Sequence, residues 1–191
     1  TKSQEGGEMA FRELKRYDGR QRGLLQDWEA WLEQADKLYD RFLGDVGDSP
    51  FLFHEVASVG FLASAAAMAG FVPLAEYAVI KRGRNDKRTR VDGRADLWIS
   101  SGSRSYSFEC KRAYFSATRK NLGNMLEHAK KDIACIQGDE SHYAAGCVLA
   151  RVRDAKRIDL YEQFAQSDEV DLAYHIGPEG EEGAYIYFSL A

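Results

Sequence analysis

An aspartate, a glutamate and a lysine stand on two consecutive segments that the sequence predicts to be short strands. Asp96 lies on the first segment, and Glu109 and Lys111 lie on the second. Because successive side chains of a strand alternate between its faces, Glu109 and Lys111 project together. If the strands pair as a hairpin through a turn at Gly102, Asp96 can lie beside Glu109. Two carboxylates and one ammonium that converge at a sheet edge would suit a Mg²⁺-dependent hydrolase.

The alternation of the second segment, residues 105–112, supports this placement. Its apolar face comprises Tyr106, Phe108 and Cys110, and its polar face comprises Ser107, Glu109 and Lys111. The segment reads as an interior strand, where a carboxylate without a partner or a metal is costly. An interior glutamate beside an aspartate therefore indicates a cation. The plain alternative is a solvated strand face with a weak ion pair.

The Glu-x-Lys triplet alone is weak support, because it occurs twice in the chain. Glu13-Leu14-Lys15 also fits, but it lies in a polar stretch that runs to about residue 20 and shows no strand alternation. No aspartate-bearing strand precedes it, whereas the second triplet follows directly on the segment that bears Asp96, residues 93–99. We therefore expect the second triplet to be the functional one.

An aspartate, a turn and Glu-x-Lys on the next strand resemble the PD-(D/E)XK nuclease superfamily, which has the restriction-endonuclease-like fold. Asp96 matches the metal-binding aspartate of that family, and Glu109 and Lys111 match the acidic residue and the lysine of its final half-motif. Glu55 matches a glutamate that many members carry on the helix before the first strand. An alanine replaces the proline of the motif, at a position that varies in the superfamily. The resemblance covers residues 51–152.

The resemblance implies a metal-dependent endonuclease that hydrolyses phosphodiester bonds, with DNA as the favoured substrate. Asp96, Glu109 and the main-chain carbonyl of Cys110 would hold Mg²⁺, for which Mn²⁺ could substitute. Lys111 would orient the attacking water or stabilise the charge that develops on the phosphate. Glu55 would be a further ligand, although its register with an apolar stripe leaves a structural role equally open.

Two other classes of protein remain alternatives. The first is a catalytically inactive protein of the nuclease fold that binds nucleic acid or a protein partner. The second is a protein-interaction module that uses the helix bearing Trp28 and Trp31 as its contact surface.

Basic residues are concentrated between residues 81 and 94, which we predict to be a loop with Gly83 and Gly93 as flexible points. They are Lys81, Arg82, Arg84, Lys87, Arg88, Arg90 and Arg94, opposed by Asp86 and Asp92. The whole chain has a formal net charge of −4, so this positive charge is local. Lysine and arginine bind a phosphate backbone with release of counterions. We therefore expect the loop to contact nucleic acid, with Arg112 swinging out from the end of the following strand, although a solvated loop would look the same.

Composition indicates one compact domain over residues 1–191. Apolar residues at 45% and charged residues at 29% are ordinary for a soluble protein. Three cysteines without metal-ligand spacing argue against a disulfide framework or a zinc site, and the four histidines are scattered. Residues 56–75 carry no charge, but they are rich in small residues and include Pro73, which favours a buried helix over a membrane span. We expect a cytoplasmic protein without a membrane partner.

The pattern of elements predicts an α/β fold, a central mixed β-sheet flanked by helices, with an extra N-terminal amphipathic helix. That helix follows residue 20 and ends at Gly44 and Gly47; its apolar face would cover the sheet, or form a homodimer that could cut both strands of a duplex. The other expected elements are a helix from about Pro50 to Met68, a strand at 74–80, the hairpin, a helix from Ser116 or Thr118 to about Ile136, a strand at 143–152, a helix at 160–164, and strands at 170–176 and 184–190.

Overall fold

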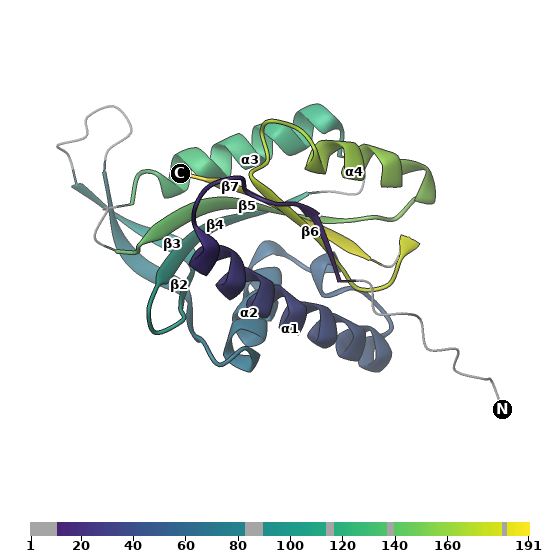
Figure 1. Cartoon of the computed structure of the whole chain (residues 1–191), viewed down its shortest axis with the longest axis horizontal. Coiled ribbons are helices and arrows are strands. Elements are labelled where there is room, and N and C mark those ends of the chain that lie inside the picture. The colour runs from purple at the N-terminus through teal and green to yellow at the C-terminus, as the bar shows by residue number, and fades with distance from the viewer. Residues whose placement is uncertain (1–10, 83–89, 114–116, 137–139, 181–182) are drawn as a thin grey trace.

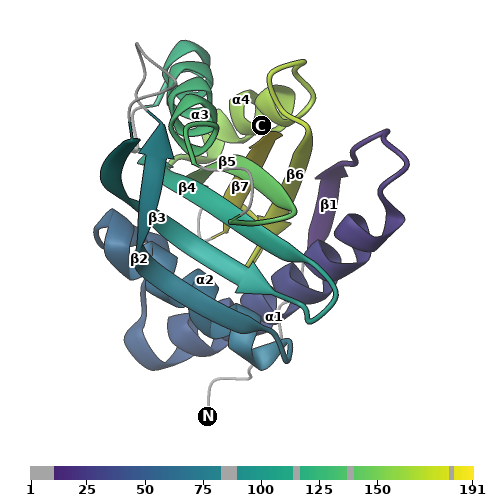
Figure 2. The same cartoon turned by 90° about the vertical axis from the view of Figure 1, so that its left-hand side faces the viewer.

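The computed structural model describes residues 11–82, 90–113, 117–136, 140–180 and 183–191. In this part of the chain, helices cover both faces of a seven-stranded mixed sheet (Figures 1 and 2). Helices α1 (Arg22–Val46) and α2 (Glu55–Met68) lie on one face, and α3 (Arg119–Ile133) and α4 (Ile158–Ala165) lie on the other. The predicted α/β class, with a mixed sheet between layers of helices, is confirmed.

The sheet has the strand order β1-β6-β7-β5-β4-β3-β2. Its strands are β1 (Arg12–Lys15), β2 (Val72–Arg82), β3 (Arg90–Ser100), β4 (Ser105–Ala113), β5 (Tyr143–Arg151), β6 (Leu172–Ile176) and β7 (Ala184–Leu190). Among the described strands, only β4 and β5 pair in parallel, joined through α3, while the other neighbouring pairs are antiparallel. The hairpin of β3 and β4 forms as predicted, with Gly102 at a φ of +88°, a conformation that glycine adopts readily.

The second predicted helix begins later than expected. Ser49 caps only a short 3-10 turn, Pro50–Leu52, after which the backbone at Phe53 is extended. His54 then caps α2 by accepting a hydrogen bond from the amide of Ala57. The expected single helix from Pro50 is therefore wrong. As a consequence, Glu55 stands in the first turn of α2, where the helix dipole favours a carboxylate, and not inside an apolar stripe.

The N-terminal segment contains a strand that the sequence analysis missed. β1 pairs with β6 at the edge of the sheet opposite β2, so the first Glu-x-Lys triplet does lie on a strand. Lys15 Nζ donates to the main-chain oxygen of Ser167 at 2.7 Å. The two triplets still differ in that an aspartate-bearing strand precedes only the second one. The expectation that the first triplet does not lie on a strand was wrong.

The amphipathic face of α1 forms part of the main core. Trp28 and Trp31 are each 1% exposed, and the ring of Trp28 packs against Phe108 and Phe188 of the sheet. The prediction that this helix covers the sheet is confirmed. Since both indoles are buried, they offer no contact surface to a partner protein, which removes the basis of the interaction-module alternative. The helix ends at Val46 with Gly47 in the left-handed conformation, while Gly44 lies within it.

Among the residues that the structure describes, none of the helices combines the length and the apolar character needed to cross a membrane. The uncharged stretch at 56–75 forms most of α2 and the start of β2. The three cysteines are free.

Gly146 of β5 allows α3 to lie close to the sheet. A β-carbon at this position would lie 2.4 Å from the amide nitrogen of Lys130, and 2.8 Å from the carbonyl carbon of Ala129. We expect Gly146→Ala to lower the free energy of unfolding by about 1–3 kcal/mol, because helix and strand must move apart. Gly60→Ala is the matched control: a β-carbon there meets no neighbouring element within 4 Å, so a gain of up to about 1 kcal/mol is expected. Urea unfolding of both variants tests this, and wild-type stability of Gly146→Ala would contradict the close approach.

Candidate functional site

The candidate site lies where β3 diverges from β4. The two strands are paired over Leu97–Ser100 and Ser105–Phe108. Beyond that point the amide of Cys110 donates to Oδ2 of Asp96 at 2.7 Å. The Asp96 side chain thus takes the place that a main-chain carbonyl of β3 would have in a continued ladder.

Side-chain alternation in β3 changes at Asp96. Ala95 packs with Val79 and Ile133 on the α3 side of the sheet, whereas Leu97, two residues later, packs in the core beneath α1 and α2. Opposite Asp96 in β2, Glu76 has a φ of +53°, a left-handed conformation that costs free energy for a non-glycine residue. Because the side chains of β3 switch between the two faces of the sheet at this point, the carboxylate of Asp96 turns toward β4.

Glu109 and Lys111 project together from β4, as the alternation predicts. Lys111 Nζ donates to Glu109 Oε1 at 2.9 Å and to the carbonyl oxygen of Cys110 at 3.2 Å. It also lies 3.7 Å from Oε1 of Glu55, whose Oε2 accepts from the amide of Arg112 at 3.1 Å. Asp96, Glu109, Lys111 and Glu55, which the sequence analysis singled out, are therefore brought together.

Lys81 is a member of the site that the sequence analysis assigned elsewhere. Its Nζ lies 3.4 Å from Glu109 Oε2, on the side of the carboxylate away from Lys111. The sequence alone assigns Lys81 to a nucleic-acid-binding loop. The signal that would have placed it is the alternation of Tyr77, Val79 and Lys81, which continues the strand past its expected end at residue 80.

Burial dominates the electrostatics of Asp96. Burial, together with the negative charges of Glu109 and Glu55, raises the pKa of this carboxyl from 3.8 to about 6. The amide of Cys110 and the charge of Lys111 oppose the shift without cancelling it. A nearby cation would favour the ionised carboxylate.

The ammonium of Lys111 stays protonated at neutral pH. Burial disfavours its charge, but the hydrogen bond to Glu109 and the charges of Glu109, Glu55 and Asp96 outweigh that effect and raise its pKa above the ordinary value. Lys111 is thus a fixed positive charge in this site and not a proton acceptor.

The donor atoms of this site could hold a magnesium ion with few protein ligands. Within the described ranges, no three Asp, Glu, His or Cys side chains form a group that could hold a metal. Mg²⁺, however, usually takes one or two carboxylates together with waters and substrate phosphates. Asp96 and Glu109 supply two carboxylates, and the Cys110 carbonyl supplies a third oxygen. Glu55 is engaged by Lys111 and by the amide of Arg112, so its contacts are those of a supporting residue.

The predicted basic loop is in large part a two-stranded ribbon. Lys81 and Arg82 end β2, and Arg90 and Arg94 lie on β3, so the interpretation of these four positions as loop was wrong. Arg84, Lys87, Arg88 and Gly83 lie outside the described residues. Gly93 is a strand residue paired with Val79 and does not provide a flexible point. The charge run resembled a loop because strand propensity is weak for basic residues, yet pairing between β2 and β3 extends the ribbon.

The basic side chains of the described ribbon have different surroundings. Arg82 and Arg90 are exposed and opposite each other in the ladder, while Arg94 forms an ion pair with Glu76. Arg112 does not swing out from the end of β4. Its guanidinium donates to the carbonyl oxygens of Phe51 and Leu52 at 3.3 Å and 3.2 Å, which ties it to the 3-10 turn before α2.

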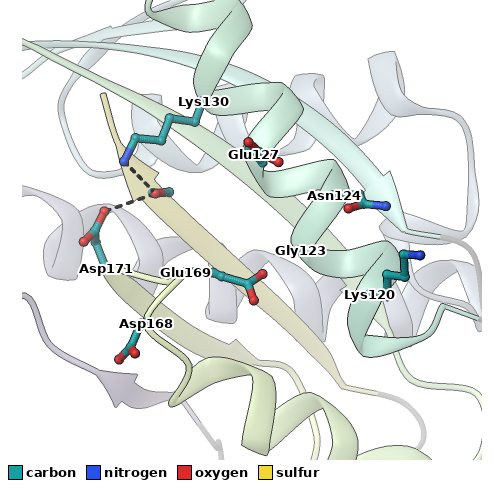
Figure 3. Close-up of a pocket in the computed structure, with 9 residues that line it drawn as sticks. Lys120, Gly123, Asn124, Glu127, Lys130, Asp168, Glu169 and Asp171 are labelled. Atoms are coloured by element: carbon teal, nitrogen blue, oxygen red, sulfur yellow. Dashed lines mark hydrogen bonds between the residues drawn. The ribbon is translucent and has the colours of Figure 1, made fainter.

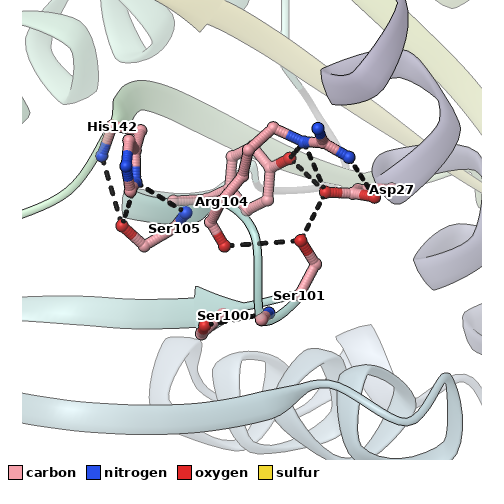
Figure 4. Close-up of polar contacts among 8 residues, drawn as sticks. Asp27, Ser100, Ser101, Arg104, Ser105 and His142 are labelled. Carbon is pink, nitrogen blue, oxygen red and sulfur yellow. Dashed lines mark hydrogen bonds and ion pairs between the residues drawn. The ribbon is translucent and has the colours of Figure 1, made fainter.

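Two other polar regions lie away from this site. Figure 4 shows Asp27 of α1 accepting hydrogen bonds from Arg104 and Ser101, which fixes the helix to the turn between β3 and β4. A cavity of about 440 Å³ lies between α3 and residues 168–171; Figure 3 shows the residues that line it. At this cavity Lys130 Nζ donates to Ser189 Oγ, which in turn donates to Asp171 Oδ2. None of the candidate site residues lines this cavity.

Fold and site together define an α/β protein with a seven-stranded mixed sheet and a carboxylate–lysine site where β3 and β4 diverge. Comparisons of the chain with models of protein families, with curated proteins and with solved structures found no match.

Proposed function

We propose that this chain is a Mg²⁺-dependent endonuclease with a restriction-endonuclease-like fold, which hydrolyses phosphodiester bonds in DNA. The observation that carries the proposal is the clustering of three side chains where β3 and β4 diverge. Asp96 accepts a hydrogen bond from the amide of Cys110, the residue after Glu109, and Lys111 Nζ lies 2.9 Å from Glu109. The resemblance to the PD-(D/E)XK superfamily assigns the same three residues to catalysis. A mixed sheet between layers of helices agrees with that resemblance.

Each residue has a role that follows from its contacts. Asp96 and Glu109 would hold Mg²⁺ with the carbonyl oxygen of Cys110. When bound, the ion would polarise the scissile phosphate and acidify a water. Lys111, as a fixed positive charge, would orient that water or stabilise the charge that develops on the phosphate. Glu55 keeps the Lys111 ammonium near the end of β4.

The β2–β3 ribbon supports nucleic acid as the substrate. It leads into the site directly, because Asp96 lies on β3 and Lys81 on β2. Arg82 and Arg90 are exposed at its described end, in a chain whose formal net charge is −4. A local basic surface beside a carboxylate site favours a polyanionic substrate over a neutral one.

A cleavage panel tests the proposal. Labelled linear duplex, single-stranded DNA, branched DNA and RNA are each incubated with Mg²⁺, Mn²⁺ or EDTA. We expect the wild type to cut DNA only with metal, and Lys111→Ala to lose at least about 100-fold in rate. Lys131→Ala is the matched control, since this lysine is exposed on α3 and pairs with Glu127; it should cut like the wild type. The absence of metal-dependent cutting by the wild type on every substrate would overturn the proposal.

One observation favours a second candidate, a protein of the same fold that binds nucleic acid without cutting it. Lys111 and Lys81 contact the two oxygens of Glu109, so this carboxylate is already neutralised by ammonium groups. A site of that kind is stable without a metal. Binding of DNA in EDTA, together with no cutting by the wild type, would support this candidate.

A further inference from the structure

Glu109 is held on both sides by lysines that come from different strands. Lys111 of β4 lies 2.9 Å from Oε1, and Lys81 of β2 lies 3.4 Å from Oε2. The side chain of Glu109 is 9% exposed, so these ammonium groups replace much of the water that the carboxylate would otherwise bind. Any cation that takes an oxygen of Glu109 must therefore displace or share one of the two contacts.

The two lysines are not equally fixed. Lys111 also donates to the carbonyl of Cys110 and lies 3.7 Å from Glu55. Among the residues that the structure describes, the ammonium of Lys81 has Glu109 as its single ion-pair partner, and that contact is the longer one. Lys81 is thus the lysine that a competing cation would release at the lower cost.

The ribbon is shaped to let Lys81 reach the site. Tyr77 OH lies 3.0 Å from Ser107 Oγ, so the face of β2 with Tyr77 and Lys81 is turned toward the polar face of β4. The stem of Lys81 crosses Gly93 of β3, where a β-carbon would lie 2.9 Å from Cδ of Lys81. Glycine at this position gives the lysine its path between the ribbon and Glu109.

We propose that Lys81 is an exchangeable residue of the site: it neutralises Glu109 in the metal-free protein and contacts the substrate phosphate once a divalent cation has taken Glu109. The inference rests on the proposed function. A Lys81 ammonium released from Glu109 would remain on the same ribbon as the exposed Arg82 and Arg90, where it would be available to a phosphate of the substrate. Metal binding would thereby create a phosphate contact that the metal-free site lacks.

Replacing Lys81 with methionine should have two opposite effects. Mn²⁺ should bind several-fold more tightly, because no ammonium competes for Oε2 of Glu109. DNA should bind about 10-fold more weakly in Ca²⁺, an oxygen-preferring ion used here to hold the complex without turnover, because a charge-assisted contact to phosphate is lost. A lysine that serves only as a structural ion pair would change the melting temperature but would not shift the two affinities in opposite directions.

The experiment measures Mn²⁺ affinity by calorimetry and DNA affinity by fluorescence anisotropy for four proteins: wild type, Lys81→Met, Lys81→Arg and the exposed control Lys131→Met. Lys81→Arg should retain most of the DNA affinity, which separates charge from side-chain identity. Thermal unfolding confirms that each variant is folded.

Two results would overturn the inference alone: Lys81→Met binds Mn²⁺ no more tightly than the wild type, or it loses no more DNA affinity than Lys131→Met does. In either case a wild type that binds Mn²⁺ and cuts DNA leaves the proposed function standing. A wild type that neither binds Mn²⁺ nor cuts DNA would overturn both.

Discussion

Asp96→Asn is expected to lose DNA cleavage and, at pH 8, to be more stable than the wild type. Loss of cleavage would follow from the loss of one of the two carboxylates proposed to hold the metal. The gain in stability follows from burial, which raises the pKa of Asp96 from 3.8 to about 6 and makes its ionised form unfavourable in the folded protein. Asparagine carries no charge, and its side-chain oxygen can still accept the hydrogen bond from the amide of Cys110.

The pH dependence of the effect has a definite sign. A carboxyl group with a higher pKa in the folded than in the unfolded chain favours folding while it is protonated, below about pH 3.8. That contribution is lost as the pH rises to about 6, and above this value the ionised group is a constant penalty. With allowance for solvent screening, we expect Asp96→Asn to gain about 1–2 kcal/mol at pH 8 and progressively less toward pH 4.

Urea unfolding of the wild type and Asp96→Asn between pH 4 and pH 8 measures this difference. Asp92→Asn, an exposed position on the same strand, is the control and should change stability by less than about 0.5 kcal/mol. Added Mg²⁺ should stabilise the wild type but not Asp96→Asn, since only the wild type retains both carboxylates. If Asp96→Asn were less stable than the wild type at pH 8, the protein's own groups would already compensate the charge of Asp96. The burial of this carboxylate would then no longer indicate a bound cation.

The candidate triplet was accessible from sequence because its geometry is largely local. Asp96, Glu109 and Lys111 stand on strands joined by a tight turn, so the hairpin at Gly102 brings the two strands together and a period of two places Glu109 and Lys111 on one face. The break in the alternation of β3 that turns Asp96 toward β4 was not visible in the sequence. Glu55 was placed correctly on a helix, but the start of that helix was not. The 3-10 turn that precedes it is held by Arg112, which is 60 residues away from Leu52 in the chain, and no local pattern reports such a contact.

The features that sequence reasoning missed depend on partners distant in the chain. β1 has four residues and pairs with β6, so its strand character comes from a neighbour some 160 positions later. Lys81 lies in a run of basic residues with low intrinsic strand propensity, and pairing with β3 imposes its extended conformation. Charge and composition therefore suggested a loop. In the structure, pairing of β2 with β3 forms a ribbon instead, and this ribbon places Lys81 beside Glu109.

Trp28→Ala is expected to lower the free energy of unfolding by about 3–5 kcal/mol, because it removes a large side chain that is 1% exposed. The ring of Trp28 contacts Phe108 of β4 and Phe188 of β7, with centroid distances of 5.2 Å and 4.6 Å. The loss would detach α1 from the strand that carries Glu109 and Lys111. Helix α1 is thus expected to be integral to the domain, although the sequence suggested an addition to a smaller core.

Phenylalanine substitutions separate packing from hydrogen bonding at the two indoles. Within the described residues the indole nitrogen of Trp28 has no hydrogen-bond partner, whereas that of Trp31 donates to the carbonyl oxygen of Leu62 in α2 at 2.9 Å. Trp31→Phe should therefore cost about 0.5–1.5 kcal/mol more than its change in packing, since the Leu62 carbonyl loses its second donor while keeping its helical hydrogen bond. Trp28→Phe should carry no such penalty. Val46→Ala, at a position 52% exposed, is the control for the helix. Denaturant unfolding measures the stability of these variants. If Trp28→Ala were as stable as Val46→Ala, the core role of α1 would be contradicted. A helix that is not part of the core can lose a contact residue without lowering the stability of the domain.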